Sequence, residues 1–223
     1  NWGDYLLFTM HGGQDGCSAR KVVHIRSIVS HMNLATIKRK IRLEPENAAF
    51  TAKGWEPIYT AHESARILII GQAPGRIAQE TKIPWNDKSG DNLRGWLGLS
   101  REEFYDKTKI ALIPMDFYFP GSKARGDVPP RKGFAEKWHP LILEQMPNIG
   151  LTILIGQYAQ EYYLGPKRKS SLTETVRAYK EYLPTYLPLV HPSPRNNIWM
   201  KKNPWFAKDM VPTLHKRIKK LLS

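Results

Sequence analysis

The stretch ILIIGQAPG, at residues 67–75, decides how the rest of the sequence is interpreted. Its first four residues form a continuous apolar run, which is typical of a strand that is covered on both faces. The loop GQAPG follows at once, and its two glycines allow a sharp turn while Pro74 stiffens it. The stretch therefore predicts a buried strand that ends in a tight loop, which a ligand can approach closely.

Apolar runs of this kind recur along the chain, and segments with helical character lie between them. The four runs are Ile67–Gly71, Ile110–Met115, Leu151–Gly156 and Tyr186–Val190. The helical segments are Leu34–Arg42, Asn92–Leu99, Phe134–Gln145, Gln157–Leu164, Leu172–Tyr182 and Val211–Leu222. Strands that alternate with helices imply βαβ units. We therefore expect an α/β fold, a three-layer α/β/α sandwich with a central, mostly parallel four-stranded sheet.

The beginning of the chain differs from the rest because it shows no sustained hydrophobic period. The tripeptide Ser30-His31-Met32, which cloning often leaves behind, lies at its end. We expect residues 1–31 to be a leader or vector-derived segment. Residues 32–223 are expected to form a single domain, since their number suits one hydrophobic core.

The charge of the chain points to nucleic acid as its partner. Lys and Arg number 34 and Asp and Glu number 20, so the formal net charge is +14. The chain also has 7 Trp, 10 Tyr and 7 Phe residues. Basic side chains neutralise phosphates, and aromatic rings offer flat faces on which bases stack. We expect a nucleic-acid-binding protein that is monomeric.

The cysteine count excludes several classes of protein. Cys17 is the single cysteine, so the chain has no internal disulfide, iron–sulfur cluster or four-thiolate zinc site. We expect no metal and no cofactor. No run reaches the roughly 18 apolar residues of a membrane span, so no membrane association is expected. The lone cysteine and the lack of a targeting signal favour a bacterial protein of the cytoplasm.

In parallel sheets ligands bind beside the carboxyl ends of the strands, so the residues that follow each run are the candidates for a binding site. The first run leads into GQAPG at 71–75, and the last leads into HPSPRN at 191–196. His191 comes directly after its strand, and two prolines stiffen the backbone behind it. Ser193 and nearby backbone N–H groups are suited to a phosphate, and Arg195 to a DNA backbone or groove.

These two loops, in this order, resemble those of the uracil-DNA glycosylase superfamily. There a motif of the GQDPY, GEAPG or GMNPG kind ends the first strand, and one of the HPSP kind ends the fourth. The resemblance covers residues 60 to 220, approximately. HPSPRN is most similar to the single-strand-selective branch. GQAPG is most similar to the GEAPG of the iron–sulfur branch, but the four cluster cysteines of that branch are absent.

The resemblance implies a monofunctional, metal-independent DNA glycosylase. Such an enzyme flips a base out of the stack, and water then hydrolyses the N-glycosidic bond. By resemblance, His191 donates to O2 of the departing base, and backbone N–H groups of Gln72 and Ala73 assist. Gly71, Pro74 and Gly75 shape the loop around the base. Trp85 lies at the distance from the first motif where the family places an aromatic ring that stacks on the base.

Two positions depart from the family pattern. Ala73 stands where several branches have Asp or Asn, and alanine cannot position a water molecule. Asp116 stands where the family commonly has an Asn that reads uracil. Its carboxylate either accepts from the base, positions the water, or serves only as a strand-end cap or salt-bridge partner. The substrate is therefore expected to be uracil or a related deaminated or damaged base.

The DNA-binding residues are expected in two segments. After the second motif, Pro194, Arg195 and Asn196 occupy the place of the wedge that fills the vacated stack. The segment Phe117–Pro140 is rich in Gly, Pro and basic residues with interleaved aromatics. The basic residues spaced to line a phosphate path are Lys123, Arg125, Arg131 and Lys132.

Three other interpretations stay open. The first is a catalytically weak or inactive DNA-binding protein that retains the glycosylase fold, which Ala73 and the missing Asn favour. The second is a flavodoxin-like or nucleotide-binding enzyme, which the absence of a Walker loop and of GxGxxG disfavours. The third is a metal nuclease, which is disfavoured because only Asp116 supplies a carboxylate at the strand ends.

Overall fold

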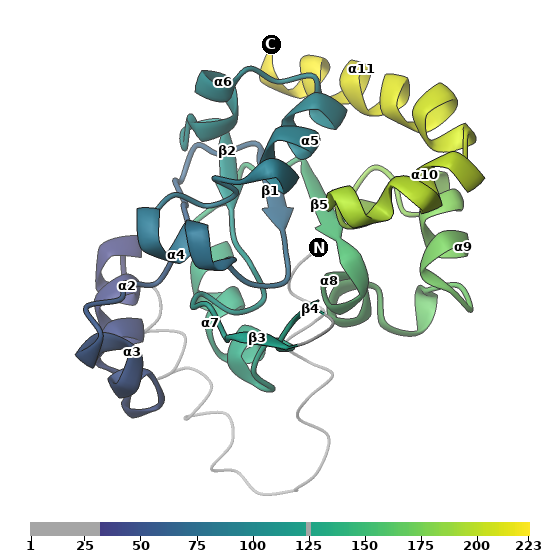
Figure 1. Ribbon diagram of the computed structural model, residues 1–223. Coiled ribbons are helices and arrows are strands. Elements are labelled where there is room, and N and C mark those ends of the chain that lie inside the picture. The colour runs from purple at the N-terminus through teal and green to yellow at the C-terminus, as the bar shows by residue number, and fades with distance from the viewer. Residues whose placement is uncertain (1–31, 124–125) are drawn as a thin grey trace, which may run out of the picture. The chain divides into compact units, whose positions relative to one another are not determined.

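The computed structural model describes residues 32–123 and 126–223 (Figure 1). The predicted leader, residues 1–31, and the predicted DNA-binding residue Arg125 lie outside the described residues. Both therefore stay predictions.

The central sheet has four parallel strands in the order β2-β1-β5-β6. Their bounds are β1 Ile67–Ile70, β2 Ile110–Leu112, β5 Leu151–Ile155 and β6 Tyr186–Leu189. Ile67 of β1 pairs with Ile110 of β2 on one side and with Leu151 of β5 on the other. Nearly every strand residue is buried. This confirms the predicted sheet, and it places both motif loops at the same edge, beyond the carboxyl ends of β1 and β6.

The strands are apolar throughout because the sheet is covered on both faces. Ile67, Ile69 and Ile153 belong to a core that includes residues of α5, α6, α9 and α11. Side chains alternate between the faces of a strand, so Leu68 and Leu154 point to the other face, where they are also fully buried. The three-layer α/β/α arrangement is thereby confirmed.

The helices follow the predicted segments with shifts at their ends. Their bounds are α2 Leu34–Leu43, α3 Ala48–Ala52, α4 Arg76–Thr81, α5 Lys88–Leu97, α6 Arg101–Tyr105, α7 Phe134–Leu143, α8 Gly156–Leu164, α9 Leu172–Arg177, α10 Asn197–Lys202 and α11 Val211–Leu222. Short 3₁₀ turns span Pro45–Asn47, Gly165–Lys167, Tyr179–Glu181 and Pro194–Asn196, and a π-helical turn spans Phe206–Met210. Figure 1 shows α10 and α11 lying together, away from α2 and α3.

One shift is at the start of α5, which begins four residues before the predicted Asn92. The reason is the Asp87 side chain, which accepts a hydrogen bond from the Gly90 N–H and caps the helix. Another difference lies in the predicted loop over residues 117–140. There β3 Ser122–Lys123 and β4 Gly126–Asp127 pair as an antiparallel hairpin. None of the helices in the described residues has the length and apolar character that a membrane span requires.

Candidate active site

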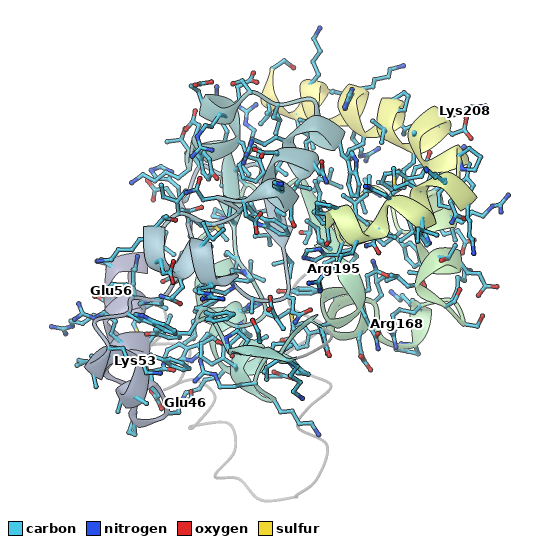
Figure 2. All side chains as sticks on the ribbon, viewed as in Figure 1. Glu46, Lys53, Glu56, Arg168, Arg195 and Lys208 are labelled. Atoms are coloured by element: carbon cyan, nitrogen blue, oxygen red, sulfur yellow. The ribbon has the colours of Figure 1, made fainter. Side chains whose placement is uncertain are left out.

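A cleft of about 560 Å³ lies at the edge of the sheet where the two motif loops meet. It is lined by all five residues of GQAPG and by four of HPSPRN. Its polar and aromatic lining residues are Gln72, Trp85, Asp87, Ser89, Ser122, Lys123, Asp127, Tyr158, His191, Ser193, Arg195 and Asn196. The structure thus brings together most of the predicted site residues. Arg195, labelled in Figure 2, is exposed.

His191 follows β6 and is partly buried in the cleft wall. Its Nδ1 accepts a hydrogen bond of 3.2 Å from the Ser193 N–H. Burial lowers the pKa of His191 below its ordinary value, while the charges of Asp87 and Asp127 act in the opposite direction. The ring is therefore neutral near pH 7, and since Nδ1 accepts, the proton lies on Nε2. That arrangement leaves Nε2–H as a donor for a ligand in the cleft.

The loop that carries His191 is held by two asparagine side chains. Asn196 Nδ2 donates to the His191 carbonyl at 2.7 Å. Asn92 of α5 donates to the Pro192 carbonyl at 2.9 Å. The amide of Asn196 therefore supports the loop, and its entry into a vacated base stack stays a prediction. Pro194 and Arg195 are exposed at the tip of the loop.

Trp85 lines the cleft beside His191, with 5.7 Å between the ring centroids. Its backbone has φ of 56°, a left-handed conformation that costs a bulky residue about 1–3 kcal/mol. The Trp85 carbonyl accepts from the Tyr105 hydroxyl at 3.3 Å and from Arg94 Nη1 at 3.4 Å. On Gly71, a Cβ atom would lie 2.8 Å from Cζ2 of the Trp85 ring. The first motif therefore needs glycine at this position so that Trp85 can stand against it.

Gln72 ties the first motif to neighbouring segments. Its side chain Nε2 donates to the Val128 carbonyl at 3.3 Å, next to the β3–β4 hairpin. The backbone carbonyl of Gln72 accepts a hydrogen bond from the Asp116 N–H at 3.1 Å. The backbone carbonyl of Gly71 accepts one from the Met115 N–H at 2.8 Å. The side-chain amide nitrogen of Gln72 is thus engaged within the protein. Gln72 therefore presents chiefly its backbone N–H group to a ligand.

Asp116 forms an ion pair with the partly exposed Arg131, so of the roles expected for its carboxylate the structure shows that of a salt-bridge partner. The Asp116 side chain is 1% exposed and accepts from Arg131 Nε at 2.7 Å and Nη2 at 2.8 Å. Nη1 of Arg131 donates to Asn47 Oδ1 at 2.7 Å, and the guanidinium lies 4.3 Å from the Phe134 ring centroid. Neither residue lines the cleft. Since the Asp116 carboxylate is engaged by Arg131 outside the cleft lining, the structure does not place it against a base or a water in the cleft, and DNA binding by Arg131 stays a prediction.

Residues 57–215 match the family model of the Uracil DNA glycosylase superfamily. The chain belongs to this superfamily. Among solved structures, the solution NMR structure of a candidate uracil DNA glycosylase from Methanosarcina acetivorans is similar, with a TM-score of 0.43. The two sequences are 16% identical, and the similarity covers 73% of this chain and 94% of that chain.

Membership of the uracil DNA glycosylase superfamily implies binding to DNA, and both motif loops lie inside the matched segment. Lys123 and Lys132, two of the predicted phosphate-binding residues, are exposed, and Lys123 also lines the cleft. The described residues hold no group of three or more His, Cys, Asp or Glu side chains that is arranged to bind a metal ion.

Five polar residues that line the cleft were not among the predicted site residues. They are Asp87, Ser89, Ser122, Asp127 and Tyr158. Asp127 and Tyr158 carry no recognisable signal in the sequence. Asp87 precedes a predicted helix, so its position near the motif was visible, but its place in the cleft depends on the fold. Asp127 belongs to a two-residue strand, which has no hydrophobic period to reveal it.

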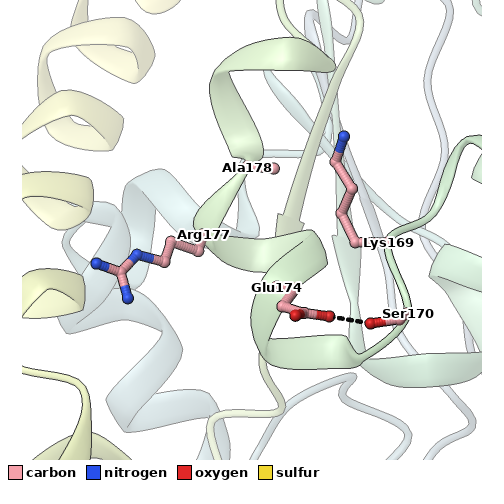
Figure 3. Close-up of a pocket in the computed structure, with 5 residues that line it drawn as sticks. All are labelled: Lys169, Ser170, Glu174, Arg177 and Ala178. Atoms are coloured by element: carbon pink, nitrogen blue, oxygen red, sulfur yellow. Dashed lines mark hydrogen bonds between the residues drawn. The ribbon is translucent and has the colours of Figure 1, made fainter.

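A second pocket, of about 460 Å³, lies on α9 (Figure 3). It is lined by Lys169, Ser170, Glu174, Arg177 and Ala178. The Glu174 carboxylate accepts hydrogen bonds from the hydroxyls of Ser170 and Ser171, and Lys169 pairs with Glu181. Since these charges are engaged with their neighbours and none belongs to a motif loop, the cleft is the site of interest.

Proposed function

We propose that this protein is a DNA glycosylase that hydrolyses the N-glycosidic bond of uracil or a related deaminated or damaged base. The observation that carries the proposal is the neutral His191, whose Nδ1 is held by Ser193 and whose Nε2–H is left for the cleft. The two motif loops that meet around it belong to the superfamily match. The base would enter the cleft after it has been flipped out of the stack.

The chemistry follows from where charge develops. As the bond between the base and C1′ breaks, a departing uracil gains negative charge, chiefly on O2. A donor that is already in place stabilises this charge, and one such donor is typically worth about 3–4 kcal/mol. His191 would supply it through Nε2–H, and the backbone N–H groups of Gln72 and Ala73 would add to it. A neutral imidazole suffices because the donated proton is on Nε2.

Trp85 would hold the flipped base. Its ring lines the cleft next to His191, and Gly71 leaves space for it. Stacking of a base on an aromatic ring contributes about 1–3 kcal/mol and tolerates different bases. The exposed Pro194 and Arg195 would enter the space that the base leaves, while Lys123 and Lys132 bind phosphates.

The proposal is tested by strand cleavage after alkali on labelled oligonucleotides. They carry uracil, hypoxanthine, xanthine or thymine, either single-stranded or paired with each base. We expect an abasic product, and hence cleavage, from at least one of these substrates. No cleavage of any of them would contradict the proposal.

Ala73 favours a second candidate, a DNA-binding protein that has lost catalysis, because the first motif supplies no water-positioning side chain. Salt-dependent DNA binding without cleavage of any oligonucleotide would support this candidate.

A further inference from the structure

The cleft contains two carboxylates from the described residues, Asp87 and Asp127, and neither belongs to a motif loop. Hydrolysis requires a water molecule to be held beside C1′ of the flipped nucleotide. Ala73 has no group that does this, and the Asp116 carboxylate is closed off by Arg131. The water-positioning group must therefore come from elsewhere in the cleft.

Asp87 is held in a fixed orientation by the helix that it caps. Its Oδ1 accepts a 2.9 Å hydrogen bond from the Gly90 N–H at the start of α5. Its Oδ2 is 3.8 Å from the position that a Cβ atom on Gly75 would occupy. One oxygen is thus anchored to the helix, while the other lies against the last residue of the first motif.

Asp87 also lies close to the second motif. Its negative charge acts on the His191 ring, and it does so more strongly than that of Asp127. Asp87 therefore lines the cleft together with the first-motif loop and the His191 ring. A sugar attached to the departing base has to pass through the same region of the cleft.

Asp127 is less suited to the role. It is exposed on β4, and its Oδ1 accepts from the Ser122 hydroxyl at 3.1 Å. Its position depends on a hairpin of two-residue strands, whereas Asp87 is partly buried at the start of a ten-residue helix. A catalytic carboxylate has to keep its geometry to within fractions of an ångström, which favours Asp87.

We propose that Asp87 is a catalytic residue whose Oδ2 orients the attacking water and stabilises the positive charge that develops on the sugar. This inference rests on the proposed glycosylase function. The bond between the base nitrogen and C1′ breaks, and its electron pair leaves with the base. The water oxygen bonds to C1′ and keeps one proton as the new hydroxyl, while its other proton passes to Asp87 and from there to solvent. The base anion takes up one proton from solvent, so Asp87 is again ionised at the end of the reaction.

The substitution Asp87→Asn separates this role from capping. Asparagine also accepts from the Gly90 N–H, so the helix start is kept, but it has no negative charge. We expect the single-turnover rate of base release to fall at least 100-fold, with the unfolding midpoint in urea unchanged. The matched control is Asp209→Asn, because Asp209 is exposed and does not line the cleft. Its rate should stay within threefold of the wild type.

A binding measurement gives a second readout, which does not depend on turnover. Oligonucleotides that carry a cationic pyrrolidine or a neutral tetrahydrofuran in place of the sugar are compared, since the cation mimics the charged sugar of the transition state. We expect the wild type to prefer the cation, and Asp87→Asn to lose at least tenfold of that preference.

The outcomes separate the two proposals. An active wild type together with an Asp87→Asn variant that keeps its rate within threefold would overturn the role of Asp87 and leave the glycosylase function intact. An unchanged preference for the cationic oligonucleotide in the variant would also overturn it. A wild type that releases none of the tested bases would contradict the glycosylase function itself, and the role of Asp87 with it.

Discussion

At the scale of single residues, the shape of the cleft depends on a glycine, Gly71, whose lack of a side chain leaves space for the Trp85 ring. Gly71 follows β1, and the Trp85 ring lies against the side of it where a Cβ atom would be. Trp85 in turn holds a left-handed backbone conformation, because hydrogen bonds from Tyr105 and Arg94 fix its carbonyl. The positions of the stacking ring and of the motif loop are therefore coupled.

Substitution of Gly71 by alanine tests this coupling. The new Cβ would lie 2.8 Å from Trp85 Cζ2, so the ring has to move. We expect the free energy of unfolding to fall by about 1–3 kcal/mol, as for other overpacked sites. We also expect base release to slow by roughly tenfold, since the stacking face is displaced. Urea denaturation and single-turnover kinetics measure the two effects.

Gly95→Ala is the matched control because a Cβ on this α5 glycine would have no neighbour within 4 Å. It should leave base release unchanged and stabilise the helix by about 0.5–1 kcal/mol. Equal unfolding free energies and equal rates in Gly71→Ala and the wild type would show that Trp85 does not depend on Gly71.

At the scale of elements, α7 and α8 are linked by hydrogen bonds to Pro114, which lines the cleft. His139 of α7 is buried, and its two ring nitrogens contact the Pro114 carbonyl at 3.0 Å and the Tyr163 hydroxyl at 2.6 Å. A neutral ring satisfies both contacts when Nε2 donates to Pro114 and Nδ1 accepts from Tyr163. Pro114 lines the cleft, so these contacts position its floor.

The buried His139 makes stability depend on pH. Burial lowers its pKa from 6.5 to about 4, so the unfolded chain binds this proton first as the pH falls. The contribution is complete above pH 6.5 and is lost as the pH falls towards 4, by about 3 kcal/mol in total. In His139→Gln, the fall in unfolding free energy between pH 7 and pH 4 should be smaller by about this amount. Equal falls in variant and wild type, measured by urea denaturation, would refute this.

The sheet was predictable from sequence because its strands are buried on both faces. Residues 67–70 and 151–155 have no polar alternation, so their apolar runs identified them directly. The β3–β4 hairpin was not predictable, since its two-residue strands lie on the surface and have no hydrophobic period. The sequence left the role of Asp116 open between a base contact, a water contact and a salt bridge. Its partner Arg131 follows that hairpin, and only the folded loop brings the two together.

At the scale of the whole molecule, the charge of +14 should dominate DNA affinity. Each phosphate that the protein neutralises releases counterions, so a contact with six to ten phosphates loses about 10³–10⁵ in affinity between 50 and 200 mM salt. We expect a loss near the lower figure. In Lys123→Ala, the slope of the logarithm of the binding constant against the logarithm of the salt concentration should become shallower by about one. Fluorescence anisotropy with a labelled oligonucleotide measures the slope.

Lys169→Ala is the control for this slope, because Lys169 pairs with Glu181 beside the second pocket. The variant should keep the wild-type slope. If Lys123→Ala and Lys169→Ala change the slope equally, the phosphate path does not run past the cleft.

The measurement that tests the account most directly is the single-turnover rate of base release by His191→Ala, on the substrate that the wild type cleaves. His191 would donate a preformed hydrogen bond to the departing base, worth about 3 kcal/mol. We therefore predict a rate at least 100-fold lower, with DNA affinity within threefold of the wild type. A variant that releases the base at the wild-type rate would contradict the assignment of the cleft as the active site.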